Sequence, residues 1–175
     1  MKQLVDLGVG QVSATRRPVA LRTPALGSCI AVVVYSAGKG IGGMAHVMLP
    51  GRAPSSAAEK TRYAVEAIEE LLERMARLGA GSDRIEAVVA GGANVLASGD
   101  DTICHKNIDS VRRTLEARGI VIRAAALGGL CRRSVSMDVT EGRVWCTEGD
   151  GQARLLWSWH QRTSHTTGQK GQPHA

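Results

Sequence analysis

The sequence predicts an α+β domain, and three observations point to this fold class. Two segments carry apolar residues at helical spacing, one over 57–77 and the other from residue 107 onward. Between and around them lie apolar β-branched runs that end at glycines, among them 30–35 and 120–126. No Gly-x-Gly-x-x-Gly or phosphate loop is present, and the elements alternate too irregularly for a doubly wound nucleotide-binding fold.

The chain is long enough for one good core. It has 175 residues, of which 43% are hydrophobic, and no Pro/Ser/Gly-rich linker interrupts residues 1–150. We therefore predict one folded domain over 1–150. Residues 151–175 form a polar, basic tail, which we expect to be disordered at its end.

Composition also limits the partners and the compartment. The N-terminus does not resemble a signal peptide and no apolar run approaches the length of a membrane span, so we expect a cytoplasmic protein without membrane insertion. The net charge of +6 would permit binding to nucleic acid, but no basic run is interleaved with aromatic residues. We therefore expect no nucleic-acid partner.

Residues 30–35 and the apolar run from Gly40 have the outline of a β-hairpin around Ser36-Ala-Gly-Lys39. If Tyr35 and Gly40 close the loop as opposed residues, Cys29 falls opposite His46. Opposed residues share a face of the sheet, with Cβ atoms about 4.5 to 5.5 Å apart. A slip of one residue, for which Gly42-Gly43 offers a possible bulge, would place the two side chains on opposite faces.

A thiol and an imidazole at that distance form the pair used by cysteine hydrolases, in which the histidine activates the thiol. The alternative is structural, because free cysteine is often buried and a lone histidine in an apolar strand is often a satisfied core residue. The spacing alone leaves both readings open.

The first helical segment, 57–77, would be capped by Ser55 or Ser56 and ended by Gly79. A strand over 85–90 leads into Gly91-Gly-Ala-Asn94, a turn where the backbone passes close to substrate or to neighbouring chain.

Asn107 is the expected cap of the second helix, which finishes at Gly119. Beyond the strand over 120–126, two further strands, 133–140 and 143–148, form a hairpin joined at Glu141-Gly142.

The four cysteines lie far apart and contain no Cys-x-x-Cys pair, which argues against a zinc ribbon or a thioredoxin-type motif. Convergence of Cys104 and His105 on Cys29 and His46 would make a metal site, but no spacing signature favours it. We expect free thiols and no metal.

The motifs together resemble the chemoreceptor glutamine deamidases of bacterial chemotaxis, the CheD family. The resemblance covers about residues 3–148. Its motifs are Leu-Gly-Ser-Cys-Ile-Ala-Val-Val-Val-Tyr (26–35), Gly-Gly-Met-Ala-His-Val-Met-Leu-Pro (42–50), Arg-Tyr-Ala (62–64), Gly-Gly-Ala (91–93) and Asn-Ile (107–108).

This resemblance implies a nucleophilic Cys29, a base at His46 and a threonine, Thr23, that orients the histidine. It implies a layered sandwich of mixed β-sheets flanked by two main helices, similar to deamidating bacterial toxins. The implied substrate is a glutamine side chain on the cytoplasmic domain of a methyl-accepting receptor. We also expect Gly27 and Ser28 to help bind it, and no cofactor is required.

Two segments depart from the family pattern, Cys-His-Lys at 104–106 and the Gly-rich stretch at 126–133, where an aspartate and one glycine are missing. These departures bear on substrate docking and on the family's partner, a CheC-like phosphatase. Two alternative functions remain, a cysteine hydrolase acting on a non-receptor amide and a non-catalytic module that binds a signalling partner.

Overall fold

The computed structural model describes residues 2–81, 84–97 and 99–160, which fold into two mixed β-sheets and two main helices. The strands are β1 (Gln3–Asp6), β2 (Val12–Thr15), β3 (Val19–Leu26), β4 (Ile30–Ser36), β5 (Ile41–Val47), β6 (Glu86–Gly91), β7 (Val121–Leu127), β8 (Arg133–Asp138), β9 (Arg143–Glu148) and β10 (Arg154–Ser158). The helices are α1 (Ala64–Met75) and α2 (Thr102–Ala117), with a short 3₁₀ turn (Lys60–Arg62) before α1 and a π turn (Ala76–Ala80) after it.

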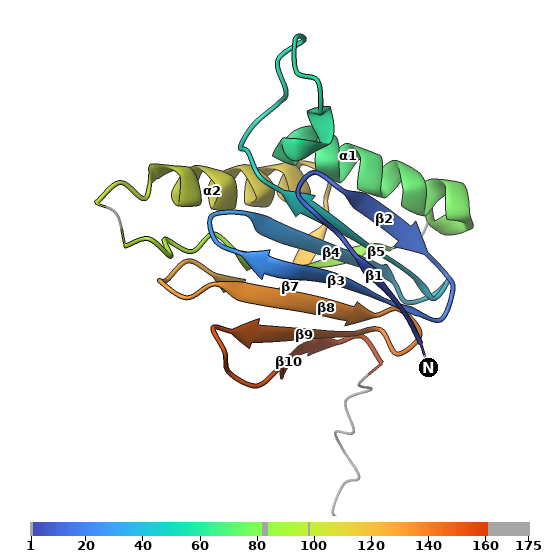
Figure 1. The fold of residues 1–175 in the computed structure, drawn as a ribbon. Coiled ribbons are helices and arrows are strands. Elements are labelled where there is room, and N and C mark those ends of the chain that lie inside the picture. Colours follow the sequence, from blue (N-terminus) through green and yellow to red (C-terminus); the bar gives the residue numbers. More distant parts are fainter. Residues whose placement is uncertain (1, 82–83, 98, 161–175) are drawn as a thin grey trace, which may run out of the picture.

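The elements form three layers, in the order helices, sheet, sheet (Figure 1). The inner sheet has the order β2-β5-β4-β6-β7, and the outer sheet has the order β1-β3-β8-β9-β10. The pairs β6–β7 and β1–β3 are parallel, whereas the other neighbours are antiparallel. The predicted α+β fold class and its layered sandwich of mixed sheets with two main helices are confirmed.

Strand β4 is buried on both faces because it lies at the centre of the inner sheet. Its residues Ile30, Val32 and Val34 pack into the core under the two helices. The alternate residues, such as Ala31 and Val33, pack into a second core between the two sheets. A residue's parity along β4 therefore decides which core it faces.

The hairpin between β4 and β5 forms as predicted, but its register differs by two residues. Tyr35 pairs with Gly42, and Ala31 rather than Cys29 lies opposite His46. The loop includes Gly40, which has a φ of 61° and so belongs to the turn and not to the strand. Because the shift is two residues, each side chain keeps its predicted face, and the pairing from Ile41 to Val47 contains no bulge.

Helix α1 begins at Ala64, seven residues later than the start predicted from the apolar period. Its N-cap is Tyr63, and neither Ser55 nor Ser56 caps it. Gly79 leaves the helical conformation with a φ of 104°, as predicted for the end of the segment.

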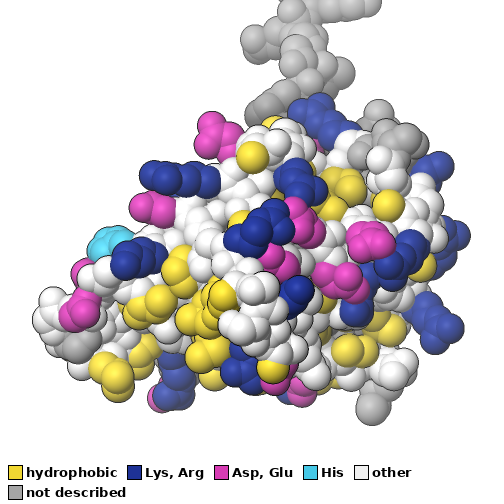
Figure 2. Space-filling model, turned by 90° about the horizontal axis from the view of Figure 1, so that it is seen from above, with side chains coloured by type: hydrophobic (Ala, Val, Ile, Leu, Met, Phe, Trp, Pro, Cys, Tyr) yellow, Lys and Arg dark blue, Asp and Glu magenta, His cyan; other side chains and the backbone are white. Residues whose placement is uncertain are grey.

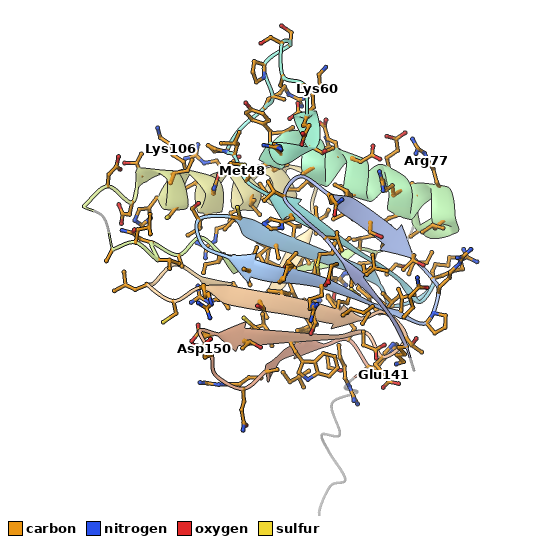
Figure 3. The ribbon with its side chains drawn as sticks, viewed as in Figure 1. Met48, Lys60, Arg77, Lys106, Glu141 and Asp150 are labelled. Atoms are coloured by element: carbon orange, nitrogen blue, oxygen red, sulfur yellow. The ribbon has the colours of Figure 1, made fainter. Side chains whose placement is uncertain are left out.

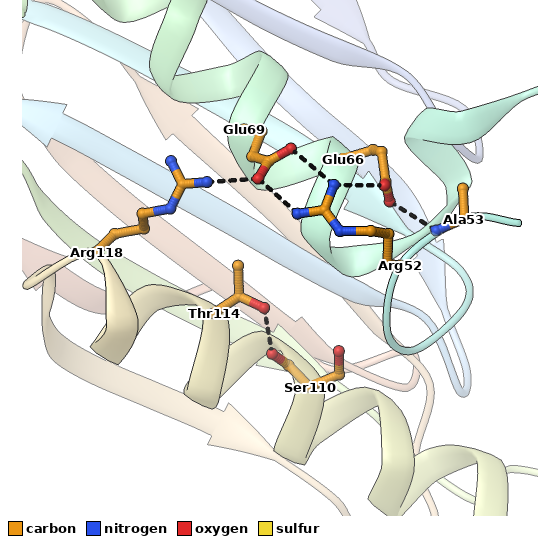
Figure 4. A network of polar contacts seen from close by, with 7 residues as sticks. All are labelled: Arg52, Ala53, Glu66, Glu69, Ser110, Thr114 and Arg118. Atoms are coloured by element: carbon orange, nitrogen blue, oxygen red, sulfur yellow. Dashed lines mark hydrogen bonds and ion pairs between the residues drawn. The ribbon is translucent and has the colours of Figure 1, made fainter. Parts of the chain in front are cut away.

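A polar network joins α1 to the chain on both sides (Figure 4). Arg52 binds Glu66 and Glu69, with N–O distances of 3.1 and 2.9 Å, and Arg118 at the end of α2 also binds Glu69. Glu66 in addition accepts a hydrogen bond from the backbone N–H of Ala53 at 2.9 Å. The network fixes the connection between β5 and α1 against both helices.

Helix α2 begins at Thr102, five residues before the predicted cap, so the expectation that Asn107 caps this helix is wrong. Asp101 is the N-cap, and the Asp100 carboxylate accepts a hydrogen bond from the Thr102 N–H at 2.9 Å. Asn107 lies inside the helix on its buried face.

Strands β8 and β9 form the predicted hairpin, and Gly142 has a φ of 55° in its turn. Strand β10 lies within the range 151–175 that we assigned to the tail, and it pairs with β9. Residues 161–175, where we expect disorder, lie outside the described residues.

Candidate functional site

One end of the sandwich carries the turn with Gly27, Ser28 and Cys29, and His46 lies near the end of β5 on the same side. β3, β5, β6, β7 and β9 end there, and β4, β8 and β10 begin there (Figure 1). In Figure 3, Asp150, just after β9, marks this end, and Glu141 marks the opposite end. The sequence brings residues 27–29, 48 and 91–94 to this end because each lies at the terminus of a neighbouring strand.

Residues 27–29, here called the Cys29 turn, connect β3 to β4. Cys29 is half-buried and packs against the core between the sheets, on the same side as Ala31. His46 has the parity of Met44, which belongs to the same core, and it lies opposite Ala31. Cys29 and His46 are therefore diagonal neighbours on one face, a relation in which Cα atoms of adjacent strands are about 7 to 8 Å apart.

Three hydrogen bonds hold the carbonyl groups of the Cys29 turn. The Ala93 N–H donates to Gly27 O at 2.8 Å, and the Gly92 N–H donates to Cys29 O at 2.9 Å. The Asn107 side chain donates to Ser28 O at 2.9 Å. The three carbonyls are thus directed at protein groups.

The turn over residues 91–94, here called the Gly91 turn, requires glycine at its first position. Gly91 has a φ of 123°, and a Cβ atom there would lie 2.1 Å from Cys29 O. The sequence predicted that backbone passes close to something at this turn, and the structure identifies that neighbour as the carbonyl of Cys29.

His46 is 3% exposed and is held by the segment that links β1 to β2. Its backbone accepts a hydrogen bond from Gly10 N–H and donates one to Gln11 O. Its Nδ1 lies 3.1 Å from Leu7 O. Because a carbonyl only accepts, Nδ1 carries the proton and Nε2 of the neutral ring is left as an acceptor.

Burial sets the protonation states of the pair. Desolvation raises the pKa of the Cys29 thiol. Desolvation also lowers the pKa of His46, and the bond to the Leu7 carbonyl opposes this only in part. Both shifts favour the uncharged forms, a thiol and a neutral imidazole. Nε2 of the ring has no hydrogen-bond partner among the described residues.

Thr23 is fully buried on β3 and has the parity of Val19 and Leu21, so it faces the core between the two sheets. Its hydroxyl makes no hydrogen bond within the described part of the chain. The described residue that makes a hydrogen bond to the His46 ring is Leu7, through its carbonyl oxygen, and sequence reasoning missed it because a main-chain carbonyl has no residue signature. The role of Thr23 stays a prediction.

Gly27 and Ser28 lie beside Cys29 in the same turn, and both are partly exposed. Their N–H groups and that of Cys29 donate to no backbone carbonyl in the ranges 2–81, 84–97 and 99–160. The Cys29 turn therefore presents donors, while its acceptors are occupied.

Exposed hydrophobic side chains gather around this end of the molecule: Met48, Val95, Leu96, Ile103 and Leu130. Leu96 is 89% exposed, so its side chain is not part of the protein core. Seen from the helix side, hydrophobic side chains cluster at the left, where α2 begins (Figure 2). In Figure 3, Met48 lies beside α2 at the exit from β5.

The segment that departs from the family pattern braces the Gly91 turn. Gly128 N–H donates to Gly91 O, and Asn94 N–H donates to Gly129 O, both at 2.9 Å. The nearly buried Arg133 donates to Gly128 O at 2.6 Å and to Glu148 at 2.9 Å. The departures at 126–133 therefore fall at the end of β7 and in the loop to β8, which is hydrogen-bonded to the Gly91 turn.

Within residues 2–81, 84–97 and 99–160, no three His, Cys, Asp or Glu side chains converge as a metal site would require. His105, one of the residues considered for such a site, is exposed and pairs with Asp101 at 2.9 Å. Over the same ranges no helix has the length and apolar character needed to cross a membrane.

The fold and the site define an α+β sandwich protein with a cysteine and a histidine on one face of a central hairpin. The family model for CheD, described as chemotactic sensory transduction, matches residues 48–148. With this match and the relatives below, the chain belongs to the CheD family.

The relatives cover most of the chain. A protein of Methanococcus maripaludis named probable chemoreceptor glutamine deamidase CheD is 38% identical over 148 residues, which are 83% of this chain and 96% of the relative. The chemoreceptor glutamine deamidase CheD of Thermotoga maritima is 32% identical over 155 residues, which are 89% of this chain and 97% of the relative.

Proposed function

We propose that this protein hydrolyses glutamine side chains of chemoreceptors to glutamate, with Cys29 as nucleophile and His46 as general base. The proposal depends above all on one observation. In a chain of the CheD family, a half-buried thiol lies on the same face as a buried histidine whose Nε2 is the unprotonated nitrogen. We expect the protein to act in the cytoplasm, where the receptors expose their signalling domains.

The reaction requires a proton transfer before or during attack, because the resting thiol is protonated. His46 Nε2 takes the proton from Cys29 Sγ, and the sulfur bonds to the carboxamide carbon of the glutamine. The imidazolium then gives its proton to the departing nitrogen, the C–N bond breaks and ammonia leaves. Water, deprotonated by the same nitrogen, attacks the thioester, and the C–S bond breaks to return the thiol and release glutamate.

The tetrahedral intermediates carry negative charge on the former carboxamide oxygen. We expect N–H groups of the Cys29 turn, including that of Gly27 or Cys29, to stabilise it, because they donate to no backbone carbonyl in the described structure. Ser28 would help position the amide. The Leu7 carbonyl would keep Nδ1 protonated and Nε2 directed at the reaction.

The exposed hydrophobic side chains around this end suit a protein substrate. A glutamine on a receptor helix would reach Cys29 only if the surrounding surface docks against neighbouring residues of that helix. Met48, Val95 and Leu96 offer apolar contact area for this purpose. A CheC-like phosphatase is the second partner that the family resemblance implies, and its binding stays a prediction.

The test is incubation of the full chain with a chemoreceptor cytoplasmic fragment, followed by mass spectrometry. Each converted glutamine gains about 1 Da and releases one ammonia. We expect conversion by the wild type and a loss of at least about 100-fold in Cys29→Ala and His46→Gln. Cys131→Ala is the matched control, because Cys131 is an exposed free cysteine.

Full activity in Cys29→Ala would contradict the proposal. Absence of conversion with several receptor fragments, while Cys29→Ala still binds them as the wild type does, would favour the non-catalytic binding module. Release of ammonia from small amides but not from receptors would favour a hydrolase with another substrate.

A further inference from the structure

Asn107 is a buried amide that connects the two elements carrying the proposed catalytic pair. It lies within α2 and is fully buried. Its Nδ2 donates to Ser28 O and to Met48 O, each at 2.9 Å. Ser28 directly precedes Cys29, and Met48 follows His46 by two residues.

The chemistry of the two bonds fixes the orientation of the amide. Both partners are main-chain carbonyls, which only accept, so both hydrogens of the NH₂ group are used. Oδ1 accepts no hydrogen bond among the described residues. A buried asparagine with one unpartnered oxygen is costly, so its two hydrogen bonds are the interactions that offset this cost within the helix.

The positions of the Ser28 and Met48 carbonyls show which two segments the Asn107 amide connects. Ser28 and Met48 lie at the start of β4 and the end of β5, just beyond the ladder that ends with the pair Ile30 and Val47. Just beyond this last pair, Asn107 bridges the segment that enters β4 and the segment that leaves β5. It therefore limits separation of the two strands at the level of the thiol.

We propose that Asn107 is a positioning residue that sets the geometry between Cys29 and His46. This inference rests on the proposed function for its catalytic consequence, whereas its structural consequence does not depend on that function. Without the amide, the bonds from Gly92 and Ala93 are the ones that the Cys29 turn would keep among the described residues. The turn would then move, and the thiol would become more exposed and further from the base.

The experiment compares Asn107→Leu with Val111→Ala. Leucine has nearly the shape of asparagine but donates no hydrogen bond. Val111 lies one turn further along α2, is buried in the core under the helices and belongs to no hydrogen bond of the Cys29 turn, so Val111→Ala weakens helix packing alone. The two variants are compared at conditions where both are folded by circular dichroism.

Two readouts are made on each variant. The first is steady-state deamidation of the receptor fragment, resolved into kcat and KM. The second is the rate at which iodoacetamide alkylates Cys29, read peptide by peptide, with the buried Cys146 as an internal reference for general opening. Asn107→Leu should lower kcat by about 10- to 100-fold with little change in KM, because small misplacements of reacting groups cost that much.

In the same variant, alkylation of Cys29 at neutral pH should become at least about threefold faster, because a more exposed thiol has a lower pKa and a larger thiolate fraction. Cys146 should keep its wild-type rate, and Val111→Ala should change neither readout beyond about twofold. Catalysis that slows while the nucleophile becomes more reactive toward a small reagent is not expected from general destabilisation.

Wild-type kcat and wild-type Cys29 alkylation in folded Asn107→Leu would overturn the inference, as would parallel increases at Cys29 and Cys146. If Asn107→Leu does not fold, Asn107→Ser, which is too short to reach the two carbonyls, is measured in the same way. If the wild type deamidates no receptor, the proposed function fails, but the alkylation readout still decides whether Asn107 holds the turn.

Discussion

His46 combines deep burial with a proton fixed on one nitrogen by a main-chain carbonyl. In many cysteine hydrolases a charged pair of thiolate and imidazolium is present before substrate arrives. Here desolvation acts on both members in the direction that keeps them neutral. Under the proposed function, the site would therefore favour proton transfer coupled to attack, and the substrate itself would exclude the remaining water.

The lowered pKa of His46 predicts a pH-dependent stability. The unfolded chain has a histidine pKa near 6.5, so below that pH it binds a proton that the folded site resists. The contribution of His46 is complete above about pH 6.5 and is lost as the pH falls toward the folded pKa. The free energy of unfolding in urea should fall between about pH 7 and 5, and less steeply in His46→Gln.

Glutamine suits this comparison because its amide can still donate to Leu7 O. Equal slopes for the wild type and His46→Gln would mean that His46 is not desolvated in solution.

At the residue scale, Cys29 and His46 could be predicted from the sequence because a thiol and an imidazole are recognisable residue types. A register shift of two residues also leaves both side chains on the predicted face. Leu7 was beyond reach, since any residue supplies a carbonyl and the fold alone brings it to the ring. The sequence pattern places Asn107 at the start of a helix, because an asparagine before an apolar run is typical of a cap. The earlier pair Asp100 and Asp101 was the better signal for the start of α2.

At the scale of elements, a glycine in the inner sheet can be required by a close packing contact as well as by a turn. A Cβ atom on Gly43 would lie 2.9 Å from Ser13 O, so this glycine permits close approach of β2 and needs no bulge. The sequence marked Gly42-Gly43 as a place where the register could slip. The sequence alone does not distinguish a bulge from tight packing, because glycine occurs at both kinds of position for the same reason, its lack of a side chain.

The Gly91 turn gives a prediction at this scale. Gly91→Ala should destabilise the protein by at least about 1 kcal/mol more than Gly119→Ala, because the new Cβ would meet a backbone carbonyl and not only the strain of a positive φ. Gly119 has a φ of 66°, and no atom of residues 2–81, 84–97 and 99–160 lies within 4 Å of its Cβ position. Gly119→Ala therefore measures the cost of a positive φ by itself. Urea unfolding gives both values, and equal losses would argue against close contact between the Gly91 turn and the Cys29 turn.

At the scale of the whole molecule, the segment after β10 joins the outer sheet to the inner one. Trp159 donates from Nε1 to Glu86 on β6 at 3.1 Å, and its ring lies 5.0 Å from that of Tyr35 on β4. Its backbone N–H donates to Gly142 O in the hairpin between β8 and β9. The composition of residues 151–175 predicts a polar tail. Strand β10 nevertheless pairs with β9, and this pairing depends on tertiary contacts that no local sequence pattern reveals.

Trp159→Ala should therefore lower the free energy of unfolding by about 2 to 3 kcal/mol, less than for a fully buried tryptophan. Deamidation by the folded variant should stay within about twofold of the wild type, because Trp159 contacts the end of the sandwich opposite to Cys29. Unfolding in urea and the receptor assay test the two statements separately. A large loss of kcat without a loss of stability would show coupling between the two ends.

The raised pKa of the Cys29 thiol also has a consequence for the protein under oxidative stress. Peroxide reacts with thiolates far faster than with thiols, and oxidation beyond the sulfenic acid is mostly irreversible. Under the proposed mechanism, Cys29 becomes a thiolate only when a substrate amide lies against it, so the thiolate would seldom meet peroxide. In that mechanism, the same burial that slows activation of the thiol would keep the sulfur reduced between encounters with substrate.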